Sequence, residues 1–217
     1  MNHSFLVDKK YKIIWIGDSG VGKTCLLTKA QKNFFDQELK STLGFEYYNI
    51  TIKIKNKKIL LQTWDTCGQE SFKCIVNMFY KRVKLAILVY SIDNRKSFEG
   101  INFWLNEIRL NSDENVKLIL VGNKNDLNDK REVSYEEGEA YAKSHKMMFL
   151  ETSAKTGHNI NQIFEKSVKQ IAKNISNNVY DLDNDSCGIR VGLNKETFIL
   201  GEGNKEEDDN KDKKRCC

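Results

Sequence analysis

Residues 17–24 read Gly-Asp-Ser-Gly-Val-Gly-Lys-Thr and fit the pattern G-x-x-x-x-G-K-[ST]. Glycines in such a loop let the backbone curl until successive N–H groups point at phosphate oxygens, and the helix that follows adds its positive dipole end. Lys23 is expected to reach the β- and γ-phosphates of a nucleotide, and the Thr24 hydroxyl to ligate Mg²⁺. The alternative interpretation is an ordinary glycine-rich turn before a helix. The sequence therefore predicts a phosphate site made by Asp18, Ser19, Gly20, Val21, Gly22, Lys23 and Thr24.

Apolar runs on both sides of this loop predict strands. They span residues 10–17, 45–55, 59–65, 84–92, 116–122 and 147–151. The second and third runs flank the polar residues 56–58 and are typical of a hairpin. The other strands are separated by helical segments, and such alternation favours a parallel sheet covered on both faces. The expected fold is α/β, a P-loop NTPase domain with a six-stranded, mostly parallel sheet.

Four helices are expected from the sequence. One helix should begin near Gly22 and another at Ser97. Ser134 and Glu137 form a capping box, which gives the next helix a well-marked start. Apolar residues at helical spacing then predict a last helix, with Ile160, Ile163, Phe164, Ile171 and Ile175 on one face.

Length and composition limit the class of protein. The 217 residues suit one domain, expected over residues 1–176, followed by a flexible, charged tail over 177–217. The net charge of +5 is spread along the chain, which argues against nucleic-acid binding. The apolar runs are shorter than the roughly 20 residues of a membrane span. The first ten residues lack a signal-peptide core, so we expect a cytosolic chain whose six cysteines are thiols without zinc spacing.

A second polar stretch, residues 123–126 (Asn-Lys-Asn-Asp), follows the strand predicted at 116–122. The Asp126 carboxylate can accept two hydrogen bonds from guanine, at N1–H and the exocyclic amine. Adenine has no N1–H, and a mismatch of this kind can cost about 10⁴-fold in selectivity. Residues 151–155 (Glu-Thr-Ser-Ala-Lys) end the next strand and are expected to complete a base site. Without the phosphate loop, residues 123–126 would more often be an exposed loop.

Taken together, these motifs resemble the Ras superfamily of small GTPases and, within it, the Rab family, from about Lys9 to Asn174. The resemblance implies a small G-domain that binds GTP and GDP with Mg²⁺. It places Lys124 and Lys155 on the guanine ring and the Ala154 N–H on the guanine oxygen. Phe35 would lie near the base, although an ordinary loop anchor is the alternative. The full guanine set is Asn123, Lys124, Asp126, Ser153, Ala154, Lys155 and Phe35.

The resemblance also covers residues 64–70 (Trp-Asp-Thr-Cys-Gly-Gln-Glu), where hydrolysis takes place in the family. It implies that the Gly68 backbone approaches the γ-phosphate and that Gln69 orients the attacking water. Gln69, Lys23 and Thr42 are therefore the expected catalytic residues. We find no arginine finger in the expected place in the chain, so intrinsic hydrolysis should be slow and helped by an activating protein.

Mg²⁺ is the expected cofactor. The resemblance assigns it to Thr24, Thr42 and Asp65, with Asp65 acting through water. Thr42 would ligate the ion only while a γ-phosphate is present, so its release after hydrolysis makes a two-state switch.

The last two residues, Cys216 and Cys217, resemble the double-cysteine ending at which Rab proteins receive two geranylgeranyl groups. Two lipids give a stable anchor where one gives reversible attachment. The resemblance implies a monomer that cycles between cytosol and the cytoplasmic face of intracellular membranes. Expected partners are an exchange factor, a GTPase-activating protein, a GDP-dissociation inhibitor, a prenylation escort protein and trafficking effectors.

Residues 131–133, 136–140, 178–181 and 188–192 resemble the Rab subgroup numbered two, which works between endoplasmic reticulum and Golgi; subgroups four and fourteen are the alternatives. The chain departs from the family pattern at Cys67, Tyr47, residues 79–83 and residues 91–93. Cys67 could disturb Gln69 and slow hydrolysis. Two other functions are weighed: a divergent nucleotide-binding scaffold with little or no hydrolysis, and a P-loop ATPase or nucleotide kinase, which the guanine motif nearly excludes.

Overall fold

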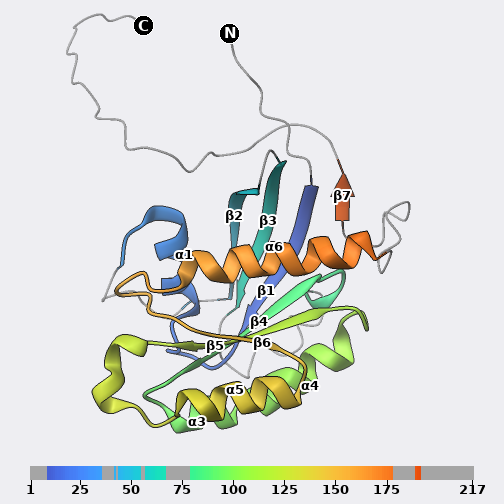
Figure 1. Cartoon of the computed structure of the whole chain (residues 1–217). Helices are drawn as coiled ribbons and strands as arrows, with labels where there is room; N and C mark the ends of the chain where they lie inside the picture. Colours follow the sequence, from blue (N-terminus) through green and yellow to red (C-terminus); the bar gives the residue numbers. More distant parts are fainter. Residues whose placement is uncertain are drawn as a thin grey trace, which may run out of the picture.

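The computed structural model describes residues 9–35, 42, 44–54, 57–66, 79–177 and 189–191 (Figure 1). The strands are β1 (Lys9–Ile16), β2 (Phe45–Ile54), β3 (Lys57–Thr66), β4 (Leu85–Ser91), β5 (Lys117–Asn123), β6 (Met148–Glu151) and β7 (Ile189–Val191). The α-helices are α1 (Lys23–Lys32), α3 (Arg95–Glu99), α4 (Ile101–Asn111), α5 (Tyr135–Ser144) and α6 (Ile160–Ser176). A 3₁₀ helix, η2, spans Asn125–Lys130.

The strands form one sheet in the order β2-β3-β1-β4-β5-β6. Neighbours along this path are parallel except β2 and β3, which pair antiparallel as the predicted hairpin. The predicted six-stranded, mostly parallel α/β fold is therefore confirmed. Because the parallel strands run in one direction, their carboxyl ends meet at one edge, where ligands bind in sheets of this kind.

A seventh strand was not expected from the sequence. β7 pairs antiparallel with the first residues of β1, with Lys9 opposite Val191 and Tyr11 opposite Ile189. β4 begins to pair with β1 only at Ile13, so the start of β1 offers an edge that β7 covers. The predicted flexible tail thus contains a short strand. The other residues of that tail after position 177 lie outside the described part.

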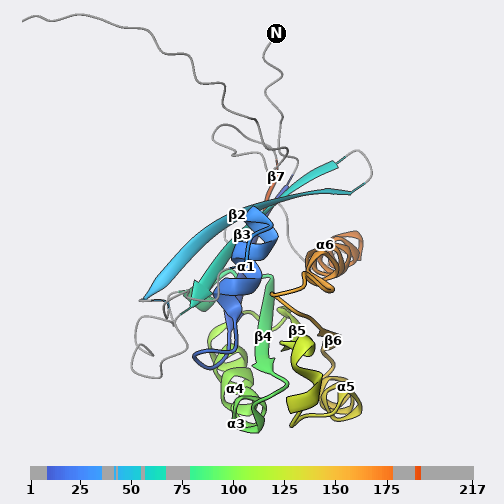
Figure 2. The same cartoon turned by 90° about the vertical axis from the view of Figure 1, so that its left-hand side faces the viewer.

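Two layers of helices cover the sheet, and side-chain alternation along each strand supplies both faces. Ile13 and Trp15 of β1 pack in the core layer that contains residues of α1 and α6. Ile14 and Ile16 pack in the opposite layer, with residues of α3, α4 and α5. Figure 2 shows these three helices together on the side of the sheet away from α6. All seven residues of β4 are buried, as expected of a central parallel strand.

The start of α5 follows the prediction in part. The Ser134 side chain accepts a hydrogen bond from the Glu137 N–H, at 3.1 Å. The Glu137 carboxylate does not return to the cap, since it pairs with Arg95. The helix predicted from Ser97 is two helices, α3 and α4, which meet at Gly100. The helix boundary was wrong because Asn94 caps α3 by accepting from the Ser97 N–H.

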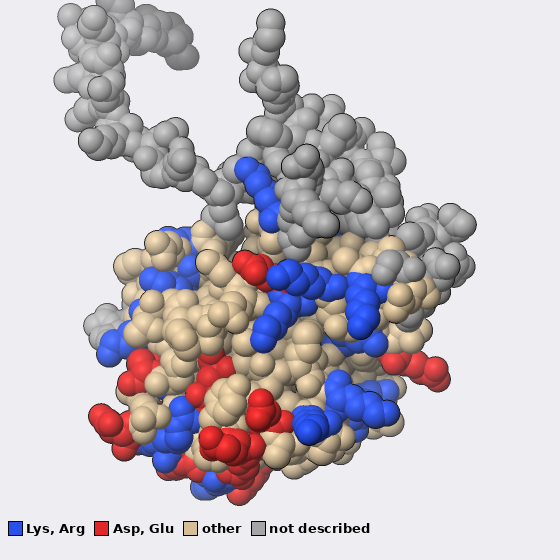
Figure 3. Space-filling model, viewed as in Figure 1, with Lys and Arg blue, Asp and Glu red and all other residues tan. Residues whose placement is uncertain are grey.

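Charge is divided over the surface. On the face in Figure 3, Lys and Arg lie mainly over α6, and Asp and Glu lie mainly over α5. On α6, Lys169 and Glu165 form an ion pair in which Nζ and Oε2 lie 3.7 Å apart. In the described part of the chain, no helix combines the length and apolar character that crossing a bilayer requires.

Candidate functional site

The loop between β1 and α1 adopts a backbone that needs glycine. Gly17, Gly20 and Gly22 have φ values of 144°, 77° and 96°, which side-chain-bearing residues rarely adopt. A Cβ on Gly17 would lie 2.1 Å from the Val89 carbonyl oxygen, and one on Gly22 would lie 2.4 Å from Asn123 Nδ2. A Cβ on Gly20 would meet nothing within 4 Å. The loop is therefore wedged against β4 and β5 on one side and open at Gly20.

Lys23 is held inside this loop at the start of α1. Its side chain is buried, with 5% of the residue exposed, and its ammonium donates to the carbonyls of Gly17 at 2.7 Å and Asp18 at 2.8 Å. A buried ammonium needs such partners because desolvation is costly. The contacts fix a positive charge within the curl of the loop, as the sequence predicts for a phosphate site.

Three oxygen-bearing side chains from different elements meet beside the loop. Thr24 is in the first turn of α1, Thr42 is in the segment before β2, and Asp65 is near the end of β3. The Thr24 and Thr42 hydroxyl oxygens lie 2.6 Å apart, and Thr24 donates to Asp65 Oδ2. The Thr42 hydroxyl lies 3.4 Å from the same carboxylate oxygen. The structure therefore brings together all three predicted Mg²⁺ ligands.

This oxygen cluster (Thr24, Thr42, Asp65) fits a hard divalent cation. Asp65 has no exposed surface, and its Oδ1 atom is buried without a hydrogen-bond partner. Burial raises the pKa of Asp65 to about 6, and the hydrogen bond from Thr24 opposes that rise. An all-oxygen donor set with an incompletely satisfied carboxylate is what Mg²⁺ accepts, directly or through its water shell.

Asn123, at the end of β5, connects the phosphate loop to the predicted base loops. Its Nδ2 donates to the Val21 carbonyl at 2.8 Å. Its Oδ1 lies 3.3 Å from both the Thr152 hydroxyl and the Ala154 N–H, which donate to it. Asn123 is 1% exposed, so it acts here as a buried bridge. The guanine contacts expected of Asn123 and the Ala154 N–H stay predictions.

Asp126 stands on the exposed first turn of η2, beyond that bridge. Its Oδ1 accepts a hydrogen bond from Ser153 Oγ at 2.6 Å, and Ser153 Oγ in turn accepts from the Thr156 N–H at 3.0 Å. The two loops predicted to recognise the base therefore hold each other. The carboxylate is oriented before any base arrives, which lowers the entropic cost of recognition.

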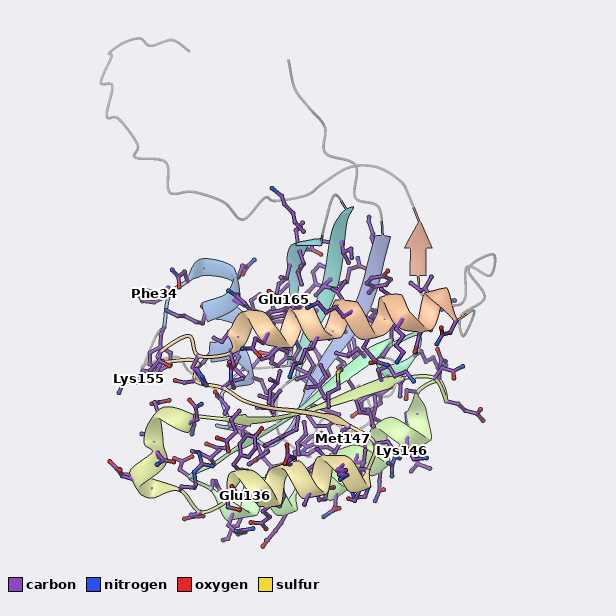
Figure 4. The ribbon with its side chains drawn as sticks, viewed as in Figure 1. Phe34, Glu136, Lys146, Met147, Lys155 and Glu165 are labelled. Atoms are coloured by element: carbon purple, nitrogen blue, oxygen red, sulfur yellow. The ribbon has the colours of Figure 1, made fainter. Side chains whose placement is uncertain are left out.

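The remaining base-site candidates lie around these loops. Lys124 precedes η2 with φ 65°, and its ammonium lies 3.9 Å from Asp93. Lys155 is exposed, and Figure 4 shows it near the start of α6, at the same end of the molecule as Phe34. Phe35 is partly buried and packs against the core beneath α1. That packing is compatible with a loop anchor, and the position of Phe35 near the base stays a prediction.

The sequence analysis missed one partner of the phosphate loop. Trp104, on α4, donates from its indole Nε1 to Asp18 Oδ1 at 2.8 Å. A Cβ on Gly100 would lie 2.8 Å from the other carboxylate oxygen of Asp18, so α4 approaches the loop closely. The two residues are 86 positions apart, and no motif spacing could have indicated the pair.

Several predicted site residues lie outside the described part of the chain. They are Gly68, Gln69, Cys216 and Cys217, together with the departure at Cys67. The described residues supply the phosphate loop, the oxygen cluster and the base loops.

A glycine-rich phosphate loop, a buried lysine and an oxygen cluster at the carboxyl edge of a parallel sheet define a P-loop nucleotide-binding protein. Comparison with protein families agrees, since the model of the Ras family matches residues 12–173. The chain belongs to the Ras family. Its domain is a small-GTPase nucleotide-binding switch, a class that generally uses Mg²⁺.

Proposed function

We propose that this chain is a Rab-type GTPase that hydrolyses GTP slowly and controls vesicle traffic from a membrane surface, between endoplasmic reticulum and Golgi. The observation that carries the switch is the position of Thr42. It lies outside the phosphate loop and outside β3, yet its hydroxyl lies 2.6 Å from that of Thr24. A residue on a separate segment that reaches the ion site can leave when the γ-phosphate leaves.

A small number of groups would carry out GTP hydrolysis. Lys23 supplies fixed positive charge to the β- and γ-phosphates, and the loop N–H groups orient them. Bound Mg²⁺ would neutralise developing charge on the phosphate oxygens, held by Thr24, Thr42 and Asp65. Gln69 would orient the attacking water. Because no arginine finger is recognised in the sequence, an activating protein would supply the remaining stabilisation.

A partner could read the switch at an aromatic surface that begins at Phe45, three residues after Thr42 in the sequence. The rings of Phe45 and Phe79 stack with centroids 4.1 Å apart, and Trp64 lies 4.9 Å from both Phe79 and Tyr47. Aromatic residues that are partly exposed favour protein interfaces. The structure also accounts for Tyr47 in place of phenylalanine, because its hydroxyl donates to Asn49 at 2.7 Å and accepts from Gln62 at 2.8 Å.

A second departure from the family pattern keeps the same kinds of chemical group. Where the family has Asp-Ile-Thr, this chain has Ser91-Ile92-Asp93. The Ser91 hydroxyl donates to the Asp93 carboxylate, which faces Lys124. The exchange thus leaves a hydroxyl and a carboxylate at the same corner, and it gives no reason to abandon nucleotide binding.

Membrane attachment through lipids on Cys216 and Cys217 is the remaining part of the proposal. It is supported by the resemblance of the chain ending to doubly lipidated Rab proteins. The alternative function, a nucleotide-binding scaffold with little or no hydrolysis, is favoured only by Cys67, which stands two residues before Gln69 in the sequence.

Single-turnover hydrolysis separates these two functions. Protein loaded with γ-labelled GTP should release phosphate slowly alone and about 10³- to 10⁵-fold faster with an activating extract. Gln69→Leu should abolish the acceleration while it retains GTP binding, and heat-treated extract serves as the control. No phosphate release from the wild type in active extract would leave only the scaffold.

A further inference from the structure

Two loops on the predicted base side are joined at their outer edge by a pair of side chains. Asn125 belongs to the loop after β5, and His158 belongs to the loop after β6, 33 residues later. Asn125 Nδ2 lies 2.7 Å from His158 Nδ1, so the amide donates to the ring when the imidazole proton is on Nε2. This Asn125–His158 bridge links the outer ends of the two loops.

The backbone on both sides of the bridge is strained. Lys124, directly before Asn125, has φ 65°, and Asn159, directly after His158, has φ 58°. Lys124 adopts this left-handed conformation at an energetic cost, whereas asparagine adopts it more readily. Such residues persist where the surrounding contacts over-determine them, and they cluster at ligand-binding positions. The bridge joins the two residues that adjoin these positions.

Backbone hydrogen bonds continue the link inward. The Asn125 N–H donates to the Thr152 carbonyl at 3.0 Å, and the Ser153 N–H donates to the His158 carbonyl at 3.2 Å. Ser153 then orients Asp126 through the 2.6 Å hydrogen bond between their side chains. Asp126 is therefore fixed from one side by Ser153 and from the other by its neighbour in the bridge.

We propose that His158 is a positioning residue for guanine recognition. It need not touch the base, because the bridge places Asn125, and Asn125 stands between the two base-site residues Lys124 and Asp126. Loss of the ring would let the loop after β5 relax out of its strained conformation. Bound nucleotide would then dissociate faster. This inference rests on the proposed guanine site.

Dissociation of two nucleotides tests the role directly. GDP and IDP differ only in the exocyclic amine of guanine, which Asp126 is expected to accept from. In His158→Ala, GDP should dissociate about three- to tenfold faster, the range expected for one hydrogen bond. IDP should change less, so the advantage of GDP over IDP should shrink. A general loosening of the fold would accelerate both nucleotides equally and would overturn the proposal.

Four further variants separate the bridge from other effects. His158→Gln keeps an acceptor and should restore most of the retention of GDP. Asn125→Ala should match His158→Ala, and the double variant should be no worse than either single variant, as a double-mutant cycle requires of a coupled pair. His145→Ala, a change at the other described histidine, at the end of α5, should leave dissociation unchanged. Additive effects of the two single variants would overturn the bridge.

Asp126→Asn distinguishes failure of this inference from failure of the proposed site. It should shift preference from GDP toward xanthosine diphosphate. If it does so while His158→Ala has no effect, the guanine site stands and the role of His158 is refuted. If Asp126→Asn leaves selectivity unchanged, the proposed guanine site is itself wrong.

Discussion

At the residue scale, two opposing influences act on the pKa of Asp65. Its burial disfavours the charged form, while hydrogen bonds from Thr24 and Thr42 and the charge of Lys23 favour it. Burial is the largest influence, so the pKa rises from 3.8 to about 6. A nearby cation stabilises the charged form of a buried carboxylate of this kind. The same burial that destabilises the protein without a ligand favours binding of the Mg²⁺ that is expected at this site.

The nucleotide-free protein should therefore lose stability as pH rises between about 4 and 6. The folded pKa of Asp65 lies above its unfolded value, so in this window the folded state binds more protons than the unfolded state. The contribution amounts to at most about 3 kcal/mol, at 1.36 kcal/mol for each unit of pKa. Denaturant titrations in EDTA at pH 4 to 7.5 would measure the free energy of unfolding.

Asp65→Asn is the reference for that titration, because an amide does not titrate. The free energy of unfolding of the variant should fall less steeply with pH than that of the wild type. Equal slopes for the two proteins would contradict the assignment of the raised pKa to Asp65.

At the scale of elements, α4 supports the phosphate loop. Gly100 ends α3 and starts α4, and the absence of a side chain there lets the Asp18 carboxylate come close. Asp18 is held on two sides, since its carbonyl accepts from Lys23 and its carboxylate accepts from Trp104. The curvature of the loop thus depends on a helix that contributes no residue to the predicted nucleotide contacts.

Trp104→Phe should consequently loosen the phosphate loop while keeping the aromatic packing of α4. The variant loses one hydrogen bond to a charged acceptor, worth about 1.5–3 kcal/mol, and the partial exposure of Asp18 lowers that figure to about 1 kcal/mol. GDP should dissociate about fivefold faster, as followed with a fluorescent nucleotide analogue. Asp18→Asn keeps an oxygen acceptor and should have a smaller effect. Unchanged dissociation in Trp104→Phe would show that the loop is fixed without α4.

The elements differ in how far the sequence could predict them. The phosphate loop was predictable because its chemistry requires adjacent residues, and the strands were predictable from apolar runs such as residues 84–92. The break at Gly100 was missed because the close approach that needs glycine comes from Asp18, far away in the sequence. β7 was missed because three residues in a polar segment carry no periodic signal, and only the uncovered start of β1 gives them a partner. The bridging role of Asn123 was missed for the same reason, because it depends on a hydrogen bond to the distant Val21 carbonyl.

At the scale of the whole molecule, β7 and the nucleotide site lie at opposite ends of β1. The nucleotide site lies where β1 ends, and β7 pairs where β1 begins. Residues 192–217 follow β7, and a segment of this length spans at most about 90 Å when fully extended. The 41 residues after α6 would span about 145 Å if none of them were paired. Pairing of β7 therefore shortens the segment that would tether the domain to the proposed lipid anchor, and it places the start of that segment at the end of the sheet remote from the nucleotide site.

The proposed anchor would hold the domain at a membrane only if its lipids bind strongly enough, and the number of lipids would decide the strength of binding. One chain of moderate length gives weak, reversible attachment, whereas two give a stable anchor. Cys216→Ser and Cys217→Ser should each leave partial recovery in the membrane fraction of cells, and the double variant should be recovered in the soluble fraction. Nucleotide binding should be unchanged in all three, because the site lies within residues 12–173, which the family model matches. Membrane recovery of the double variant equal to that of the wild type would place the anchor elsewhere, and β7 would then set the length of a linker that ends in no lipid.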